Sequence, residues 1–447
     1  MKIIITGTYG IGTLTRLLAR NDNEITIIND TENERMEKIA GEYDILAIHA
    51  SPTDRQAMKE AGAGSADLFI AVTLDQNQNI VACGIAKNLG AKKTVAKVVD
   101  YKYADPKMQL AFEQMGVDST IYPEALAAKD IISGLKMSWV RQRWDVHDGA
   151  LVLLGIKIRE TCKIMDKPLK DISGPEDPYH VVAIKRGTET LIPGGNDQLK
   201  LYDLAYFMTT KNFIPTIREL VGKEGYADVK NVMVMGGGST AVRAIREMPS
   251  YMDVKLFEKN EQRCEDLLDK LDRSNLMIIH GDGRDVTLLK EENIGNTQAF
   301  VALTENDETN ILACIMAKRL GVRKTVAMVE NIDYLTMAES LDIGTIINKK
   351  AITGSHIYQM LLEANVLNVR FLLTVNADIA EFIPQEGSRI TRKPVKELNL
   401  PQGVNIGGLV RNGVGMLVSG NTQIEAGDEV MMFCHNGDMK KMEKLFM

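Results

Sequence analysis

The chain lacks the features that mark membrane, secreted and disulfide-rich proteins. It has no run of about 18 apolar residues, so no membrane-spanning helix is predicted. It begins with strand-like Lys2-Ile3-Ile4-Ile5, and no signal peptide is expected. Its 5 cysteines are scattered without a C-x-x-C pair, which argues against a disulfide framework and a zinc site. The net charge of -7 argues against broad binding to nucleic acid or anionic lipid, and the cytoplasm is the expected compartment.

The most informative feature present is an internal duplication. Residues 67–99 align with residues 298–330, and about half of the aligned positions are identical. In both halves, short strands rich in Ile and Val alternate with amphipathic helices. This order predicts an α/β fold with two tandem Rossmann-like, doubly wound parallel sheets, each followed by a small α+β domain.

The predicted division of the chain has six parts. Rossmann-like domains cover 1–122 and 229–348, connector helices cover 123–148 and 349–368, and small domains cover 149–224 and 369–447. The strands that open the small domains are predicted at 151–156 and 370–375. The connectors carry apolar residues at near-helical spacing, which fits a helix packed on its own sheet and equally a helix that crosses onto a neighbouring subunit.

A glycine-rich turn in the second half carries the main functional signal. It has the G-x-G-x-x-A spacing, with Gly236 for the tight turn, Gly238 for close approach to a phosphate and Ala241 for helix packing. The first helical N–H groups, at Ser239 and Thr240, are expected to face the anion. The turn therefore predicts a site for a phosphate-bearing nucleotide.

The next strand ends in Glu258, at the position where a ribose-binding carboxylate is expected. A glutamate facing the ribose disfavours a 2′-phosphate, so NADP is expected to bind poorly.

The tandem repeat and the stretch 424–430 (IEAGDEV) resemble the RCK family of ligand-gating domains, and within it the peripheral subunits of Trk-type potassium uptake systems. The resemblance covers essentially the whole chain. It implies that the small domains are RCK-C domains and that the glycine turns bind adenine nucleotides, namely NAD(H), ATP or ADP. It also implies that Asp282 and Thr304, with the loop residues Asn306 and Asp307, lie by the second nucleotide.

The same resemblance implies a partner and a place in the cell. Proteins of this kind form a cytoplasmic ring, expected here to be a homotetramer, docked on an integral membrane potassium-translocating subunit of the TrkH or TrkG type. The chain is then expected to gate potassium uptake as a regulatory subunit on the inner face of the plasma membrane. No catalytic residue, metal or nucleic acid is expected.

The first half departs from the nucleotide-binding pattern. Tyr9 stands where the middle glycine belongs and would crowd a pyrophosphate. The second strand ends in Asn29-Asp30, so the carboxylate is displaced by one residue or replaced by an amide. We therefore expect an impaired or altered first site. The residues assigned to it are Gly7, Gly10, Ile11, Gly12, Asp30 and Thr73.

Other functions stay open on the sequence. An NAD-dependent oxidoreductase would need a proton donor near the nicotinamide, and no suitable His-Asp or Tyr-x-x-x-Lys pair is evident. A DNA-binding redox sensor would need a basic stripe, whereas Arg323-Lys324 is expected to be a solvated loop. A nucleotide-sensing regulator of another monovalent cation transporter would fit the same motifs. The acidic stretch 305–308 is explained by helix-opening acids without a metal.

Overall fold

The computed structural model describes residues 1–19, 23–30, 34–172, 177–362, 365–372, 377–401, 403–435 and 439–447. The chain separates into two units, each with its own internal packing. Unit 1 comprises Met1–Leu126 with Lys349–Glu363, and unit 2 comprises Ala127–Asn348 with Ala364–Met447. Within the described ranges, none of the helices has both the length and the apolar character needed to cross a membrane.

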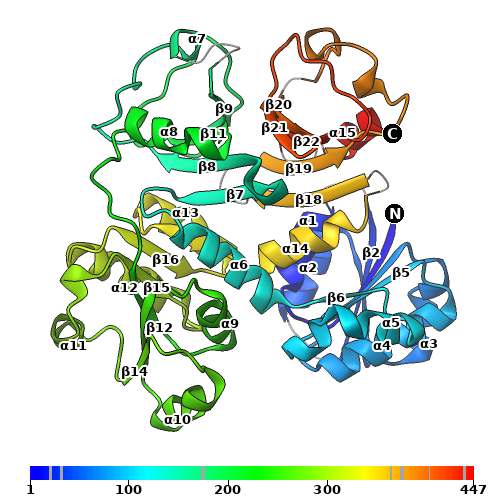
Figure 1. Cartoon of the computed structure of the whole chain (residues 1–447). Coiled ribbons are helices and arrows are strands. Elements are labelled where there is room, and N and C mark those ends of the chain that lie inside the picture. Colours follow the sequence, from blue (N-terminus) through cyan, green and yellow to red (C-terminus); the bar gives the residue numbers. More distant parts are fainter. Residues whose placement is uncertain are drawn as a thin grey trace. The chain divides into compact units, whose positions relative to one another are not determined.

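A six-stranded parallel sheet lies at the centre of each Rossmann-like region (Figure 1). The orders are β3-β2-β1-β4-β5-β6 and β14-β13-β12-β15-β16-β17, which is the doubly wound arrangement and confirms the predicted fold class. The first sheet contains β1 (Lys2–Thr6), β2 (Glu24–Asn29), β3 (Leu46–His49), β4 (Leu68–Ala71), β5 (Lys93–Lys97) and β6 (Ser119–Ile121). The second contains β12 (Asn231–Met235), β13 (Asp253–Glu258), β14 (Leu276–His280), β15 (Ala299–Ala302), β16 (Lys324–Met328) and β17 (Thr345–Ile347).

Helices connect these strands and cover the sheets, so the central strands are buried on both faces. Ile3, Ile4 and Ile5 of β1, for example, are fully buried. The first set of helices is α1 (Ile11–Leu18), α2 (Glu34–Tyr43), α3 (Arg55–Glu60), α4 (Gln76–Leu89) and α5 (Gln109–Gln114). The second set is α9 (Ser239–Glu247), α10 (Glu261–Lys270), α11 (Val286–Glu291), α12 (Asp307–Arg319) and α13 (Ile332–Ser340).

The small domains are five-stranded antiparallel sheets with equivalent strand orders, β7-β8-β11-β9-β10 and β18-β19-β22-β20-β21, and both lie in unit 2. The first contains β7 (Gln142–Val146), β8 (Leu151–Lys157), α7 (Leu169–Ile172), β9 (Tyr179–Arg186), β10 (Glu189–Leu191), β11 (Leu204–Thr209) and α8 (Ile214–Leu220). The second contains β18 (Asn365–Leu372), β19 (Ala377–Ile383), β20 (Val404–Arg411), β21 (Val414–Leu417), β22 (Glu429–His435) and α15 (Met439–Phe446). The two sheets share one hydrophobic core, in which Leu153 and Met208 join Ile379 and Phe433. The duplication therefore extends through the small domains.

The prediction of a helix over 123–148 is wrong beyond Leu135. Helix α6 spans Pro123–Leu135, and the following Gln142–Val146 forms β7, which pairs with β8. The alternating pattern of this segment suits an edge strand, because every second side chain can face the core. The prediction for 349–368 fails in the same way, because α14 covers Lys349–Gln359 and β18 starts at Asn365.

The predicted equivalence of the opening strands is also wrong by one strand. The counterpart of β8 is β19, whereas residues 370–372 belong to β18, the counterpart of β7. The remainder of the predicted strand 370–375 lies outside the described residues. The two apolar segments looked alike because both face the shared core.

The connectors cross between the two halves of one chain. Helix α14, which follows the second sheet, packs against α1 in unit 1, where a Cβ on Gly354 would lie 2.6 Å from Leu17 Cδ1. Most of α6, from Ala127 onward, belongs instead to unit 2 with the second sheet. Helix α14 thus packs on the other half of the chain and not on its own sheet, whereas packing of a connector on a neighbouring subunit stays a prediction.

Candidate functional site

The glycine turn of the second half lies at the carboxyl end of β12, just before α9. Gly236 has a φ of 94°. A Cβ at Gly236 would lie 3.1 Å from both the backbone N and the Cγ2 of Thr304. The fold thus brings the predicted residues Gly236 and Thr304 into direct contact, and it leaves room only for a glycine. Ala241 is fully buried in α9, as its predicted packing role requires.

The backbone donors where this turn enters α9 are open, whereas the N–H groups of Gly236 and Gly237 are bonded to Phe257 and Glu258. Gly238 occupies the N-cap position of α9, and no side chain of the described residues caps the helix. In the described part of the chain, the N–H groups of Gly238, Ser239 and Thr240 have no acceptor. Three adjacent donors at a helix N-terminus form a site that attracts phosphate oxygens.

The Glu258 carboxylate is fixed at the end of β13, only 8% exposed. Its Oε2 accepts a hydrogen bond from Gly237 N–H at 2.9 Å, and its Oε1 accepts one from Asn260 N–H at 2.9 Å. Each carboxylate oxygen can accept a further bond. The turn and the carboxylate therefore form one rigid unit that can hold a phosphate and a pair of hydroxyl groups.

Asp282 lies beside this unit, because the N–H of Gly281 donates to the Glu258 carbonyl oxygen at 2.9 Å. Its carboxylate pairs with Arg284 at 2.6 Å. The hydrogen bond from Arg284 lowers the pKa of Asp282 below its usual range, although partial burial opposes the shift. A ligand that used Asp282 would compete with Arg284.

A buried asparagine holds the loop after β15 in place. Asn310 Oδ1 accepts from Thr304 N–H at 3.0 Å, and its Nδ2 donates to the carbonyl oxygens of Thr304 and Met328, each at 2.9 Å. The first half repeats the arrangement, with Asn79 binding Thr73 and the carbonyl of Lys97. Sequence analysis missed both asparagines as positioning residues, although their recurrence in the repeat was a usable signal.

The acidic stretch after Thr304 is engaged in contacts within the protein. Asn306 caps α12 by accepting from Thr309 N–H at 2.6 Å. Asp307 accepts from Asn331 N–H at 2.8 Å, and Glu308 accepts from the Tyr334 hydroxyl at 2.6 Å. Among the described residues, no group of three potential ligands could hold a metal ion.

The first-half turn has a different geometry. Gly7 has a φ of 96°, and a Cβ there would lie 2.5 Å from Thr73 N, so these two predicted residues also meet. The N–H of Tyr9 donates to the Val72 carbonyl at 3.0 Å, and the N–H of Ile11 donates to Thr8 at 3.3 Å. The two donors that correspond to the open N–H groups of Gly238 and Thr240 are therefore satisfied internally.

The strand-end carboxylate is replaced by an amide in the first half. Asn29 is 2% exposed and pairs with His49, just as Glu258 pairs with His280, whereas Asp30 is exposed one residue beyond the strand. Of the remaining predicted residues, Gly10 has a φ of 64° at the N-cap of α1, and Ile11 and Gly12 follow it in the first turn of that helix.

Lysine side chains cover the first turn. Lys97, 3% exposed, places its Nζ 4.6 Å from the centre of the Tyr9 ring and donates to the Thr73 carbonyl at 3.4 Å. Burial lowers the pKa of Lys97, and nearby Lys349 adds to the effect while Glu124 opposes it. Helix α14 brings Lys350 against the turn, with its Cγ 3.3 Å from where a Cβ on Gly10 would lie. In the second half, Met328 stands at the position of Lys97.

Arg263 is a second feature of the site that sequence reasoning missed. It comes from α10, and its Nε donates to the Gly237 carbonyl at 3.3 Å. This puts a guanidinium at the edge of the turn, where it could pair with a phosphate. No sequence signal marked it, because only the packing of α10 on the sheet brings it there.

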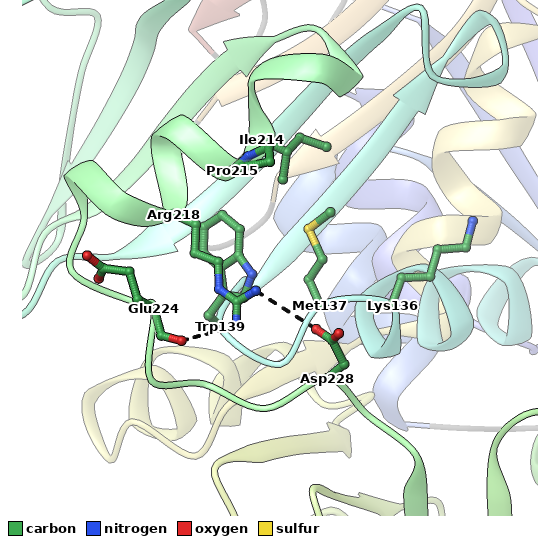
Figure 2. Close-up of a pocket in the computed structure, with 8 residues that line it drawn as sticks. All are labelled: Lys136, Met137, Trp139, Ile214, Pro215, Arg218, Glu224 and Asp228. Carbon is green, nitrogen blue, oxygen red and sulfur yellow. Dashed lines mark hydrogen bonds and ion pairs between the residues drawn. The ribbon is translucent and has the colours of Figure 1, made fainter.

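A separate pocket of about 300 Å³ lies in unit 2, where the segment after α6, helix α8 and the chain between the two halves meet (Figure 2). Arg218 pairs there with Asp228 at 4.0 Å and donates to the Glu224 carbonyl. The pocket includes none of the predicted site residues, so we do not assign it to the nucleotide turn. Its lining residues are Lys136, Met137, Trp139, Ile214, Pro215, Arg218, Glu224 and Asp228.

Comparisons with known proteins agree with this architecture. Residues 3–123 and 232–349 match the TrkA-N domain, and residues 379–447 match the TrkA-C domain. Relatives include the Trk system potassium uptake protein TrkA of Azorhizobium caulinodans, 28% identical over 100% of this chain and 98% of the relative. A Trk system potassium uptake protein TrkA homolog of Archaeoglobus fulgidus is 26% identical over 100% of both chains.

The solved structures support the fold. The GsuK RCK domain superposes with a TM-score of 0.60 at 14% identity, covering 100% of this chain and 94% of that one. The GsuK channel bound to NAD gives a TM-score of 0.59 at 13% identity, covering 100% of this chain and 78% of that one. The RCK fold is thus shown by the structures and the family by the sequence. The chain belongs to the TrkA-N domain family, with two TrkA-N domains and a C-terminal TrkA-C domain.

Proposed function

We propose that the chain is a regulatory subunit that binds an adenine nucleotide at the second glycine turn and thereby gates potassium uptake through a separate membrane subunit. The single observation that carries the proposal is the pairing of three open backbone donors, at Gly238, Ser239 and Thr240, with the fixed Glu258 carboxylate. This combination suits the phosphate and ribose of one nucleotide. Potassium is proposed as the transported ion because the relatives are named potassium uptake proteins.

NAD(H), ATP and ADP are the proposed ligands. A solved channel with the same fold carries NAD, which supports the class of ligand at the level of fold. A buried glutamate at the ribose disfavours the extra charge of NADP, so NADP should bind weakly. The first turn, with Tyr9 and an amide in place of the strand-end acid, is proposed to bind nucleotide poorly or in a different manner.

A binding role is favoured over catalysis. The groups gathered at the second turn are backbone donors, one carboxylate, Thr304 and Arg263, and they hold a ligand without offering a proton donor that has a positioned partner. We therefore propose that nucleotides act as regulatory ligands and undergo no chemical change.

Gating requires that the nucleotides bind two conformations unequally. ATP, ADP and NAD(H) share an adenosine phosphate but differ beyond it, so they can favour different angles between the large and small domains. A tenfold preference for one state corresponds to about 1.4 kcal/mol per site. We propose that a homotetrameric ring on the cytoplasmic face transmits this bias to an integral membrane potassium-translocating subunit.

Nucleotide titration tests the site. ATP, ADP and NADH would be titrated calorimetrically into the full-length protein, into Glu258→Ala and into Glu265→Ala, which removes an exposed carboxylate from the same domain. Hydrogen bonds to a charged group contribute about 1.5–3 kcal/mol, so Glu258→Ala should weaken binding at least about tenfold, with the control unchanged. Wild-type affinity in Glu258→Ala would contradict the assignment.

Transport measurements test the role. The chain would be reconstituted in vesicles with the membrane subunit of a Trk system, and potassium flux would be recorded with and without nucleotide. Nucleotide-dependent flux that disappears in Glu258→Ala supports gating. Substrate-dependent turnover of NADH by the chain alone would favour an oxidoreductase.

A further inference from the structure

Five basic side chains gather near Asp342 at the junction of the first small domain and the second Rossmann-like sheet, and the carboxylates of Asp203 and Glu339 lie at the border of this group. The five basic side chains lie in unit 2, on the segments 141–159 and 318–345 (Figure 1). The group, called the basic cluster here, consists of Arg141, Lys157, Arg159, Lys318 and Lys324, with Asp342 among them.

Asp342 receives three of the five cations. Arg141 Nη2 donates to its Oδ1 at 2.5 Å, Arg159 Nη2 bonds to its Oδ2, and Lys318 Nζ lies 3.3 Å from Oδ2. One negative charge is thus shared by three positive ones. Asp342 itself has a φ of 53°, in the left-handed region, so the surrounding contacts hold an uncommon backbone conformation.

Among the residues that the structure describes, the other two cations have no carboxylate partner. Lys324 is 3% exposed, and its Nζ donates only to the Val140 carbonyl at 2.6 Å and to Thr345 Oγ1 at 3.0 Å. Lys157 is half-buried and makes no hydrogen bond or ion pair with any residue that the structure describes. The expectation that Lys324 belongs to a solvated loop is therefore wrong, because β16 carries it into the domain junction.

Burial and the surrounding positive charges together lower the pKa values of the three lysines in this cluster. Burial lowers the pKa of Lys318 to about 8, and the charge of Arg141 adds to the shift. Burial, and then Arg141, hold the pKa of Lys324 well below its usual range. Burial likewise lowers the pKa of Lys157; Arg141 and Arg159 add to the shift, and Asp342 and Asp203 oppose it. An added anion would relieve this repulsion.

Solvent reaches the cluster, and the cluster lies away from the glycine turn. The side chains of Arg159, Lys318 and Asp342 are 29%, 26% and 33% exposed. Lys324 begins β16 and Asp342 precedes β17, so the cluster lies at the amino ends of the strands. The glycine turn follows the carboxyl end of β12, at the opposite edge of the same parallel sheet. A ligand here would occupy a second, independent position.

We propose that the basic cluster is a binding site for a multivalent phosphate-type oxyanion, which joins the first small domain to the second Rossmann-like domain. Guanidinium groups at Arg141 and Arg159 match the geometry of phosphate oxygens, and the two lysines without carboxylate partners supply further positive charge. Because the cluster takes side chains from both domains, the anion would stabilise the contact between them. The anion would therefore act on the protein from a site that is separate from the nucleotide turn.

The test uses tripolyphosphate as the probe, titrated calorimetrically into full-length protein carrying Glu258→Ala, which weakens nucleotide binding at the glycine turn. The open backbone donors of the turn remain in this variant, so the lysine variants described below identify which of the two sites the probe occupies. We expect saturable binding that is absent with potassium chloride at matched ionic strength. At pH 8 the binding should take up protons, because an anion raises the pKa of Lys318, and the measured enthalpy should therefore depend on the ionisation enthalpy of the buffer.

Matched variants separate this site from general charge attraction. Lys157→Gln removes a cation without breaking any hydrogen bond or ion pair between described residues, and it should weaken tripolyphosphate binding about tenfold, the effect of one charge-assisted hydrogen bond. The pair Lys157→Gln and Lys318→Gln should abolish binding. The pair Lys167→Gln and Lys290→Gln removes the same charge from exposed positions in the same two domains and should leave binding unchanged.

A parallel titration with ATP identifies the source of the phosphate. If ATP binds the Glu258→Ala protein and the added pair Lys157→Gln and Lys318→Gln removes that binding, the site is supported with a nucleotide as its ligand. This holds even if tripolyphosphate does not bind. The proposal would be overturned if neither tripolyphosphate nor ATP bound. It would also be overturned if the Lys167→Gln and Lys290→Gln pair lost as much binding as the Lys157→Gln and Lys318→Gln pair. Neither result depends on whether wild-type protein binds NADH at the glycine turn.

Discussion

Replacement of Asn310 by alanine should release the loop that borders the second glycine turn. Asn310 is fully buried. Its amide group accepts from the N–H and the hydroxyl of Thr304, at 3.0 and 2.7 Å, and donates to the carbonyls of Thr304 and Met328, both at 2.9 Å. Alanine removes all of these bonds and introduces no new partner.

The expected magnitude follows from the groups left behind. A buried polar group without a partner costs about 1–3 kcal/mol, and the N–H of Thr304 and the carbonyl of Met328 both lose their partner. The sum, about 3 kcal/mol, corresponds to an increase of about a hundredfold in the opening constant of the loop. Since Gly236 packs against Thr304, nucleotide affinity at the turn should fall as well.

Hydrogen–deuterium exchange measures this effect locally. Peptides covering 299–310 should lose protection in Asn310→Ala, while peptides covering 68–79 keep it. The matched variant Asn79→Ala should show the reverse, because Asn79 makes the corresponding bonds to Thr73 and Lys97. Wild-type protection of 299–310 in Asn310→Ala would refute the reasoning, as would an equal loss of nucleotide affinity in the two variants.

Two further predictions concern a backbone position and a buried carboxyl group. Gly236→Ala should lower the free energy of unfolding by roughly 1–2 kcal/mol, because φ is 94° and the added Cβ would press on Thr304. Denaturant unfolding measures this difference, and a midpoint equal to that of the wild type would contradict the prediction. Burial, and then the charge of Glu429, raise the pKa of Glu381 from 4.5 to about 7. The folded state thus favours the protonated form, so this contribution to stability is complete below pH 4.5 and is lost as pH rises through about 7. Glu381→Gln should therefore raise the melting temperature at pH 8 and reduce its decline between pH 5 and 8. Thermal unfolding of the wild type and the variant across that range checks this prediction. Parallel curves of melting temperature against pH would contradict it.

The sequence alone predicted the features that depend on neighbouring residues. Alternation of short apolar strands with amphipathic helices predicted the two doubly wound sheets, because periodicity reflects which faces are buried. The duplication predicted that the halves share one topology, which the equivalent strand orders confirm. The residues of the two nucleotide turns remain predictions, although the fold brings Gly236 to Thr304 and fixes Glu258 beside Gly237.

The tertiary structure decided what depends on residues far apart in the chain. Helix α14 packs on α1 of the other half through Gly354, and no periodicity of its own sequence reveals that partner. The sequence predicts a helix where the structure has strand β7, because this segment becomes a strand only by pairing with β8. Lys324 reads as a loop charge in the sequence, yet the packing of the first small domain on the second sheet buries it beside Arg141. The local sequence pattern determines which face of a helix or strand is buried. Which element packs on that face is determined only when segments far apart in the sequence bury their apolar surfaces against each other.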